Sequence, residues 1–196
     1  MREQIMGLIT PTMAIVFFAV FLVMWWRGKM GSYVLGFAAA YLFFAIGFGT
    51  THLFDTGSPY VFHITQFFYS MSTATAIWAL TRRAGQPPYL GVLLVIYALS
   101  AVTLAVAVVT TPEISSRLII VNVGYGAMYL VCLMSLLGGQ RREAIDKLII
   151  VAHSILAAQF MIRPVLTLLV EQGIAADGYR ESVYYSVLNL SLALIS

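Results

Sequence analysis

Two histidines lie close together in this sequence, at a point where the chain turns between two apolar segments. His52 lies near the end of the segment from Ser32 to Phe54, and His63 near the start of the segment from Tyr60 to Leu80. The turn between these segments is short, so they must be antiparallel neighbours whose ends lie close together. Because imidazole nitrogens bind transition metals at neutral pH, the pair predicts a metal site.

The residue types narrow the choice of metal without settling it. Two neutral imidazoles favour copper or a b-type haem, with zinc a weaker third candidate, whereas calcium and magnesium prefer oxygen ligands. Copper would need a third ligand, and Met161 is the methionine expected at the closest depth. A haem would need a cation beside a propionate, which Arg163 or Arg180 could provide.

Further polar residues are expected in the layer of His63. At about 1.5 Å of rise per residue, Arg163 lies about 10 Å inside the outer end of its segment, and Asn122 lies at a comparable depth. A cation buried at that depth costs about 3 kcal/mol unless it finds a partner. We therefore predict that Arg163, Asn122, Gln66 and Met161 bind or support the cofactor around His63.

The segment that begins near His63 carries one polar stripe. Its members recur at helical spacing and are His63, Gln66, Ser70 and Thr73. We expect this stripe to face the bundle interior, where its residues either bind a ligand or make interhelical hydrogen bonds. The third histidine, His153, falls in a different, inner layer and is either an alternative ligand or a hydrogen-bonded bundle residue.

Composition indicates what positions these residues. The chain is 61% hydrophobic and 10% charged, with a mean hydropathy of +0.91, which is typical of an all-α polytopic membrane protein. Seven apolar segments are predicted as transmembrane helices. They are Gln4 to Trp26, Ser32 to Phe54, Tyr60 to Leu80, Tyr89 to Thr110, Arg117 to Leu137, Asp146 to Val170 and Ser182 to Ser196.

The basic residues predict an orientation. The first, third and fifth connections carry Arg27 and Lys29, then Arg82 and Arg83, then Arg141, Arg142 and Lys147. By the positive-inside rule these connections are cytoplasmic, the N-terminus is outside and the C-terminus points to the cytoplasm. We expect an integral protein of the bacterial inner membrane.

The last apolar segment, Ser182 to Ser196, is short. Its length as a helix is about 22 Å, against a hydrocarbon core of roughly 30 Å. We therefore expect residues 1–196 to be one seven-helix transmembrane domain that continues into a cytoplasmic output domain. The residues carry no convincing catalytic motif, so we do not expect these seven segments to be an enzyme.

The run Gly49-Thr50-Thr51-His52-Leu53 resembles the corresponding helix of the ethylene-binding domain of plant and cyanobacterial ethylene receptors. The run Ser72-Thr73-Ala74-Thr75-Ala76 in the following segment is similar too. The resemblance implies that His52 is a copper ligand. In that family a cysteine one helical turn earlier is the second ligand, and here Phe48 stands in its place.

The layout of the whole chain resembles the multi-helix membrane input domains of bacterial diguanylate cyclases and sensor histidine kinases. The resemblance implies a sensor that signals through its last helix. A small transporter, or a haem- or quinone-interacting subunit of a respiratory assembly, are the alternatives. We expect the lipid bilayer, a small ligand or metal and a second copy of the chain as partners, and no nucleic acid.

Overall fold

The computed structural model describes residues 2–28, 30–53, 59–111, 114–139 and 144–170. Within these residues the chain forms six helices and no strand. The helices are α1 (Arg2–Trp26), α2 (Tyr33–Leu53), α3 (Pro59–Arg83), α4 (Leu90–Thr110), α5 (Ile114–Leu137) and α6 (Ala144–Val170). The all-α prediction is confirmed for this part of the chain. The predicted seventh segment and Arg180 lie outside the described residues.

The first six predicted segments match the observed helices to within three residues at each end. The larger differences occur where a helix extends beyond the apolar pattern at one end. α3 runs on past Leu80 to Arg83, because the long stems of arginine can lie along a helix while their charges reach water. α5 likewise begins at Ile114, before the predicted start at Arg117.

Four of the described helices are long and apolar enough to cross a membrane. They are α2, α4, α5 and α6, with the apolar spans Tyr33–Thr51, Leu90–Thr110, Ser115–Leu137 and Ala144–Leu166. α1 contributes a shorter apolar stretch, Thr10–Trp26. α3 carries the polar stripe and two terminal arginines, which lower its mean hydropathy. The chain therefore has the composition and helix lengths of an integral membrane protein.

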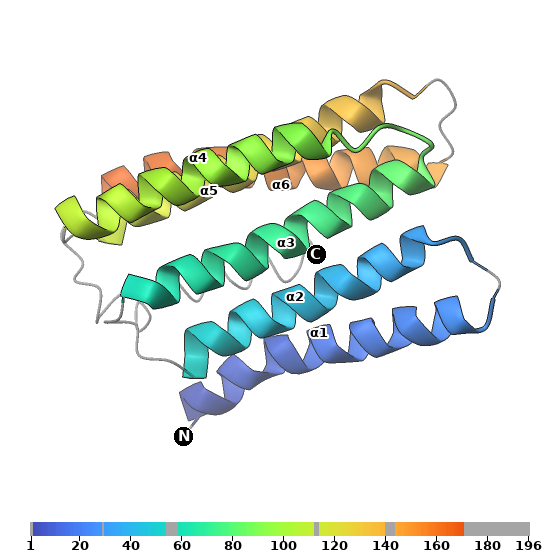
Figure 1. The fold of residues 1–196 in the computed structure, drawn as a ribbon, viewed down its shortest axis with the longest axis horizontal. Coiled ribbons are helices and arrows are strands. Elements are labelled where there is room, and N and C mark those ends of the chain that lie inside the picture. The colour runs from blue at the N-terminus through green and yellow to red at the C-terminus, as the bar shows by residue number, and fades with distance from the viewer. Residues whose placement is uncertain (1, 29, 54–58, 112–113, 140–143, 171–196) are drawn as a thin grey trace.

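Consecutive helices run antiparallel, and α3 lies at the centre of the bundle (Figure 1). α1 packs on α2, and α2 packs on α3. On its other side α3 contacts both α4 and α5, and α6 packs on α5. The least apolar helix is thus surrounded by the more apolar ones.

Glycines allow α2 to approach α3 closely. A Cβ atom on Gly36 would lie 2.7 Å from the Trp78 ring and 2.8 Å from the Ala79 Cβ. A Cβ on Gly47 would lie 2.9 Å from the Tyr69 ring. Only glycine fits at both contacts, which is the usual way in which membrane helices gain van der Waals packing.

The connection from α3 to α4 has a defined backbone. Gly85 has φ +67°, and the Gln86 amide donates to the Thr81 carbonyl at 2.8 Å, as in a Schellman cap. The Ser135 hydroxyl on α5 donates to the Pro87 carbonyl at 2.6 Å. These contacts fasten the connection to the end of α5.

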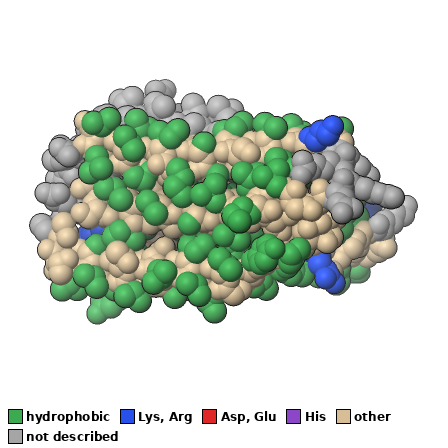
Figure 2. All heavy atoms as spheres, turned by 90° about the horizontal axis from the view of Figure 1, so that it is seen from above, with side chains coloured by type: hydrophobic (Ala, Val, Ile, Leu, Met, Phe, Trp, Pro, Cys, Tyr) green, Lys and Arg blue, Asp and Glu red, His purple; other side chains and the backbone are tan. Residues whose placement is uncertain are grey.

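The outer surface is apolar along the helices. Figure 2 shows hydrophobic side chains along the part of this face that is not drawn in grey, with Lys and Arg side chains toward its ends. On α4, Leu94, Leu99, Val102 and Val109 are all strongly exposed. Such a surface is stable against lipid, while polar side chains such as Gln66 and Asn122 lie inside the bundle.

Candidate functional site

The polar stripe of α3 is buried, as its spacing predicts. Gln66, Ser70 and Thr73 are 5%, 2% and 9% exposed, while His63 is half-buried. The stripe faces α5, since the Tyr125 hydroxyl donates to the Gln66 main-chain carbonyl at 3.5 Å. The central helix α3 therefore places polar side chains in the interior of the bundle.

α5 presents a matching face to this stripe. The Tyr125 hydroxyl adjoins Ser70, and the Tyr129 hydroxyl adjoins Thr73. We call Gln66, Ser70, Thr73, Tyr125 and Tyr129 the polar seam. It joins α3 to α5 over two helical turns.

The sequence analysis missed the two tyrosines of the seam, although a signal for them exists. Asn122, Tyr125, Tyr129 and Cys132 recur at the same intervals of three, seven and ten residues as His63, Gln66, Ser70 and Thr73. All four are on the buried side of α5. The two matching stripes pack against each other, and only their comparison would have predicted the pairing of α3 with α5.

The seam continues toward α6 through aromatic rings. Tyr129 stacks on Phe160 with 5.4 Å between ring centroids and an interplanar angle of 11°. Tyr125 lies 5.6 Å from Phe160, and the His153 ring lies 5.9 Å from Tyr129. Three helices, α3, α5 and α6, therefore meet at the same group of side chains.

His153 has a defined tautomer in this arrangement. Its Nδ1 atom lies 2.9 Å from the Ile149 carbonyl oxygen. Because a carbonyl can only accept, Nδ1 must carry the hydrogen, and in the neutral ring Nε2 keeps the lone pair. The second nitrogen of His153 is thus the one available to a ligand or a hydrogen-bond donor.

Two residues of the predicted outer layer are buried inside the bundle. Asn122 on α5 is 4% exposed, and its Nδ2 donates to the Leu118 carbonyl at 2.6 Å. Arg163 on α6 is 9% exposed. The Gln66 Oε1 atom is buried and has no hydrogen-bond partner among the described residues. Buried polar groups normally have partners, so this amide oxygen could accept a bond from a ligand or water.

Met161 packs closely against α5. A Cβ on Gly126 would lie 2.7 Å from the Met161 Cε and 3.2 Å from its Sδ. The methionine therefore fills the space that Gly126 leaves, and this packing fixes the position of its thioether. Its predicted role as a third copper ligand stays a prediction.

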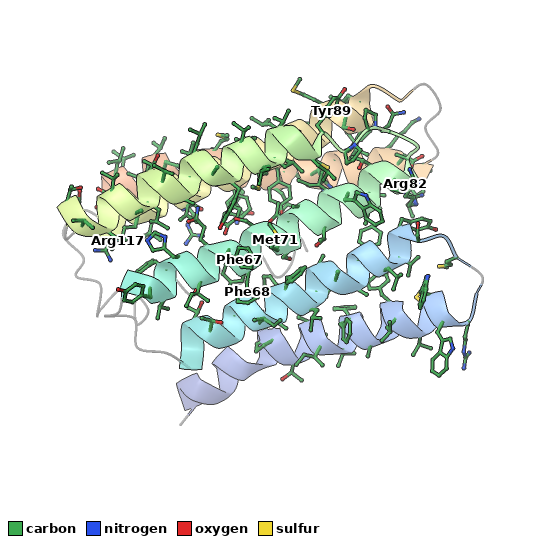
Figure 3. The ribbon with its side chains drawn as sticks, viewed as in Figure 1. Phe67, Phe68, Met71, Arg82, Tyr89 and Arg117 are labelled. Carbon is green, nitrogen blue, oxygen red and sulfur yellow. The ribbon has the colours of Figure 1, made fainter. Side chains whose placement is uncertain are left out.

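Arg117, near the start of α5, contacts the N-terminal end of α3 and the C-terminal end of α4. Its guanidinium lies 5.1 Å from the centroid of the Phe62 ring, and its Nη2 donates to the Thr111 carbonyl at 3.4 Å. Figure 3 shows Arg117 beside the N-terminal end of α3. The sequence analysis had treated Arg117 only as the start of a segment, because a cation–π contact has no sequence signature.

The ends of α2 and α3 that carry the histidine pair do come together. The Thr51 and Thr65 hydroxyl oxygens lie 3.4 Å apart. Thr51 directly precedes His52, and Thr65 lies two residues after His63. His52 lies in the last turn of α2, but its side chain is outside the described residues. The geometry of the histidine pair therefore stays a prediction.

The described donors do not complete a metal site. The described part of the chain contains no group of three or more His, Cys, Asp or Glu side chains that could hold a metal ion. Cys132 is fully buried in the half of α5 away from His63. Comparisons with known proteins found no matching family model, no matching curated protein and no matching solved structure.

Proposed function

We propose that this chain is a membrane-embedded sensory input domain, in which the outer polar layer receives a stimulus and the polar seam carries the response to α6. The observation that supports this most is the burial of the seam between three helices. Polar side chains inside a membrane bundle are costly unless they are used, so a binding or switching role explains their presence. In the sequence α6 is followed by the predicted seventh segment, through which the response would leave the domain.

The proposal includes seven membrane spans with the N-terminus outside. Arg27, Arg82, Arg83 and Lys147 lie at the same end of the bundle, where α1 and α3 end and α6 begins. By the positive-inside rule this end faces the cytoplasm. The site around His63 would then lie near the extracytoplasmic surface of a bacterial inner membrane.

We further propose that the stimulus acts through copper or a b-type haem held by His52 and His63. The contact between Thr51 and Thr65 supports this, because it brings the two helix ends together. Either cofactor would supply redox or gas-binding chemistry when bound. Gln66 and Asn122 would orient the ligand, and Arg163 would stabilise negative charge beside it.

An absorption spectrum combined with metal analysis of the purified full-length protein tests the cofactor. We expect a Soret band or stoichiometric copper, lost in both His52→Ala and His63→Ala. His153→Ala is the matched control, because His153 lies near Tyr129 in the inner half of the bundle. Wild-type protein without haem or copper would overturn the cofactor proposal.

A transporter is the second candidate, because the seam places polar groups along much of the length of α3. Flux assays separate the two functions. A transporter reconstituted in liposomes would carry solute across the bilayer, and Gln66→Leu would abolish that flux. A sensor would carry none, while its ligand would still raise its unfolding temperature. A respiratory subunit would instead copurify with haem or quinone and its partner chains.

A further inference from the structure

An ion pair joins α3 and α6 at one end of the bundle. The Arg83 Nη1 atom in the last turn of α3 donates to Asp146 Oδ1 in the first turn of α6 at 2.9 Å. Within the described residues, α3 and α6 have no extended contact along their lengths. The pair is about one-quarter exposed on each side, so solvent and headgroups can reach it.

A small pocket lies beside this ion pair. Its volume is about 30 Å³, which is enough for one water molecule. Apart from the ion pair its lining is almost wholly apolar. The other lining residues are Leu80, Ala84, Leu136, Gly139, Ile149 and Ile150. The pocket thus has a charged edge and an apolar wall.

The two helix turns that carry the ion pair hold more positive than negative side chains. Arg82 and Lys147 are both exposed and lie in the same two helix turns as Arg83 and Asp146. The described side chains of these turns therefore include three cations and one carboxylate. An anion bound at this edge would replace Asp146 as the partner of Arg83. The three cations would still balance the two negative charges.

This end of the bundle lies where lipid headgroups are expected. Arg82 and Tyr89 both lie at it in Figure 3. The exposed side chains of Tyr89 and, at the end of α1, Trp26 are of the kind that lies at the membrane–water interface. Basic pockets between helices at this depth are suited to the phosphate of an anionic lipid.

We propose that this pocket binds an anionic phospholipid. Its phosphate contacts Arg83, with Arg82 and Lys147 contributing positive charge, and part of an acyl chain lies against the apolar wall. Asp146 competes with the phosphate for Arg83. Lipid binding therefore loosens the link between α3 and α6. This inference rests neither on the cofactor nor on the orientation.

Native mass spectrometry of the full-length protein in detergent tests the proposal, with phosphatidylglycerol and phosphatidylcholine titrated separately. Wild-type protein should bind phosphatidylglycerol more tightly. Arg83→Gln should weaken that binding about fivefold, the usual contribution of one basic residue near the surface. Asp146→Asn should strengthen it, because the competitor for Arg83 is removed. Arg27→Gln is the matched control, removing a cation from the same end but outside the pocket lining, and should leave the affinity unchanged.

The opposite signs expected for Arg83→Gln and Asp146→Asn distinguish this site from a merely structural ion pair. Equal binding of both lipids would overturn the proposal, as would a loss in Asp146→Asn equal to that in Arg83→Gln. If Arg27→Gln lowered the affinity for phosphatidylglycerol as much as Arg83→Gln does, binding would come from diffuse positive charge and not from the pocket, which would also overturn the proposal. Inorganic phosphate that displaces phosphatidylglycerol at equal concentration would mean a free phosphate site instead. If Arg83→Gln does not fold, the double variant Arg83→Lys/Asp146→Asn is used instead. It keeps a cation at residue 83 and removes the competing carboxylate, so it should bind phosphatidylglycerol at least as tightly as wild type. Weaker binding than in wild type would overturn the proposal.

Discussion

Tyr129 on α5 stacks on Phe160 on α6 with 5.4 Å between ring centroids, and its hydroxyl adjoins Thr73 on α3. One side chain thus joins three helices, through its ring on one side and its oxygen on the other. Helices in lipid associate by van der Waals packing and hydrogen bonds, since lipid tails are as apolar as leucine. Tyr129 provides both kinds of contact.

Truncation at this contact should destabilise the bundle. We expect Phe160→Ala to lower the free energy of unfolding by about 2 kcal/mol, because Phe160 packs against both Tyr125 and Tyr129. Tyr129→Phe keeps the stacking and should cost only about 0.6 kcal/mol. Leu169→Ala, at an exposed site on α6, is the control and should change stability little. Denaturant titration in mild detergent measures all three, and equal losses in them would contradict this account of the interface.

The approach of α2 to α3 should depend on Gly36. Gly36→Ala places a Cβ 2.7 Å from the Trp78 ring, so we expect a loss of about 1 to 3 kcal/mol. Gly49→Ala lies on the same helix with no atom within 4 Å of its Cβ, and should be neutral or mildly stabilising. Thermal unfolding of the two variants checks this pair. A Gly49→Ala variant less stable than Gly36→Ala would mean that the helices pack differently.

Gln66 should separate stability from function. Its Oε1 is buried with no hydrogen-bond partner among the described residues, so Gln66→Leu removes a costly polar group at similar volume. We expect its unfolding temperature to equal or exceed that of wild type. Ligand binding or flux, whichever the protein performs, should fall at the same time. A large loss of stability would show that Gln66 serves mainly to hold α3 in place.

The lone cysteine makes topology testable. Cys132 is fully buried, so wild-type protein in membranes should resist a membrane-impermeant maleimide. In a Cys132→Ser background, Tyr60→Cys and Arg82→Cys place single thiols at opposite ends of α3, at exposed positions. We expect Tyr60→Cys to react in intact spheroplasts and Arg82→Cys only after permeabilisation. The reverse pattern would invert the proposed orientation, and labelling of both in intact cells would mean that α3 does not span.

The helix positions and one interior face could be predicted from the amino-acid sequence. Apolar runs of about 20 residues predict helix positions well, because a backbone in lipid must satisfy its hydrogen bonds within each segment. The helical spacing of Gln66, Ser70 and Thr73 likewise predicted a buried stripe, since polar side chains avoid lipid. These are local properties, and they need no knowledge of which helix lies beside which.

The partners of these side chains on other helices could not be predicted from the sequence and are known from the folded bundle. The pairing of Tyr129 with Thr73 and Phe160, and that of Arg83 with Asp146, join residues far apart in the chain. An apolar helix face fits lipid and many other helices about equally, so hydropathy does not choose its neighbour. The shapes of the facing side chains choose the neighbour instead. Gly36 leaves room for the Trp78 ring, and Gly126 leaves room for the Met161 side chain.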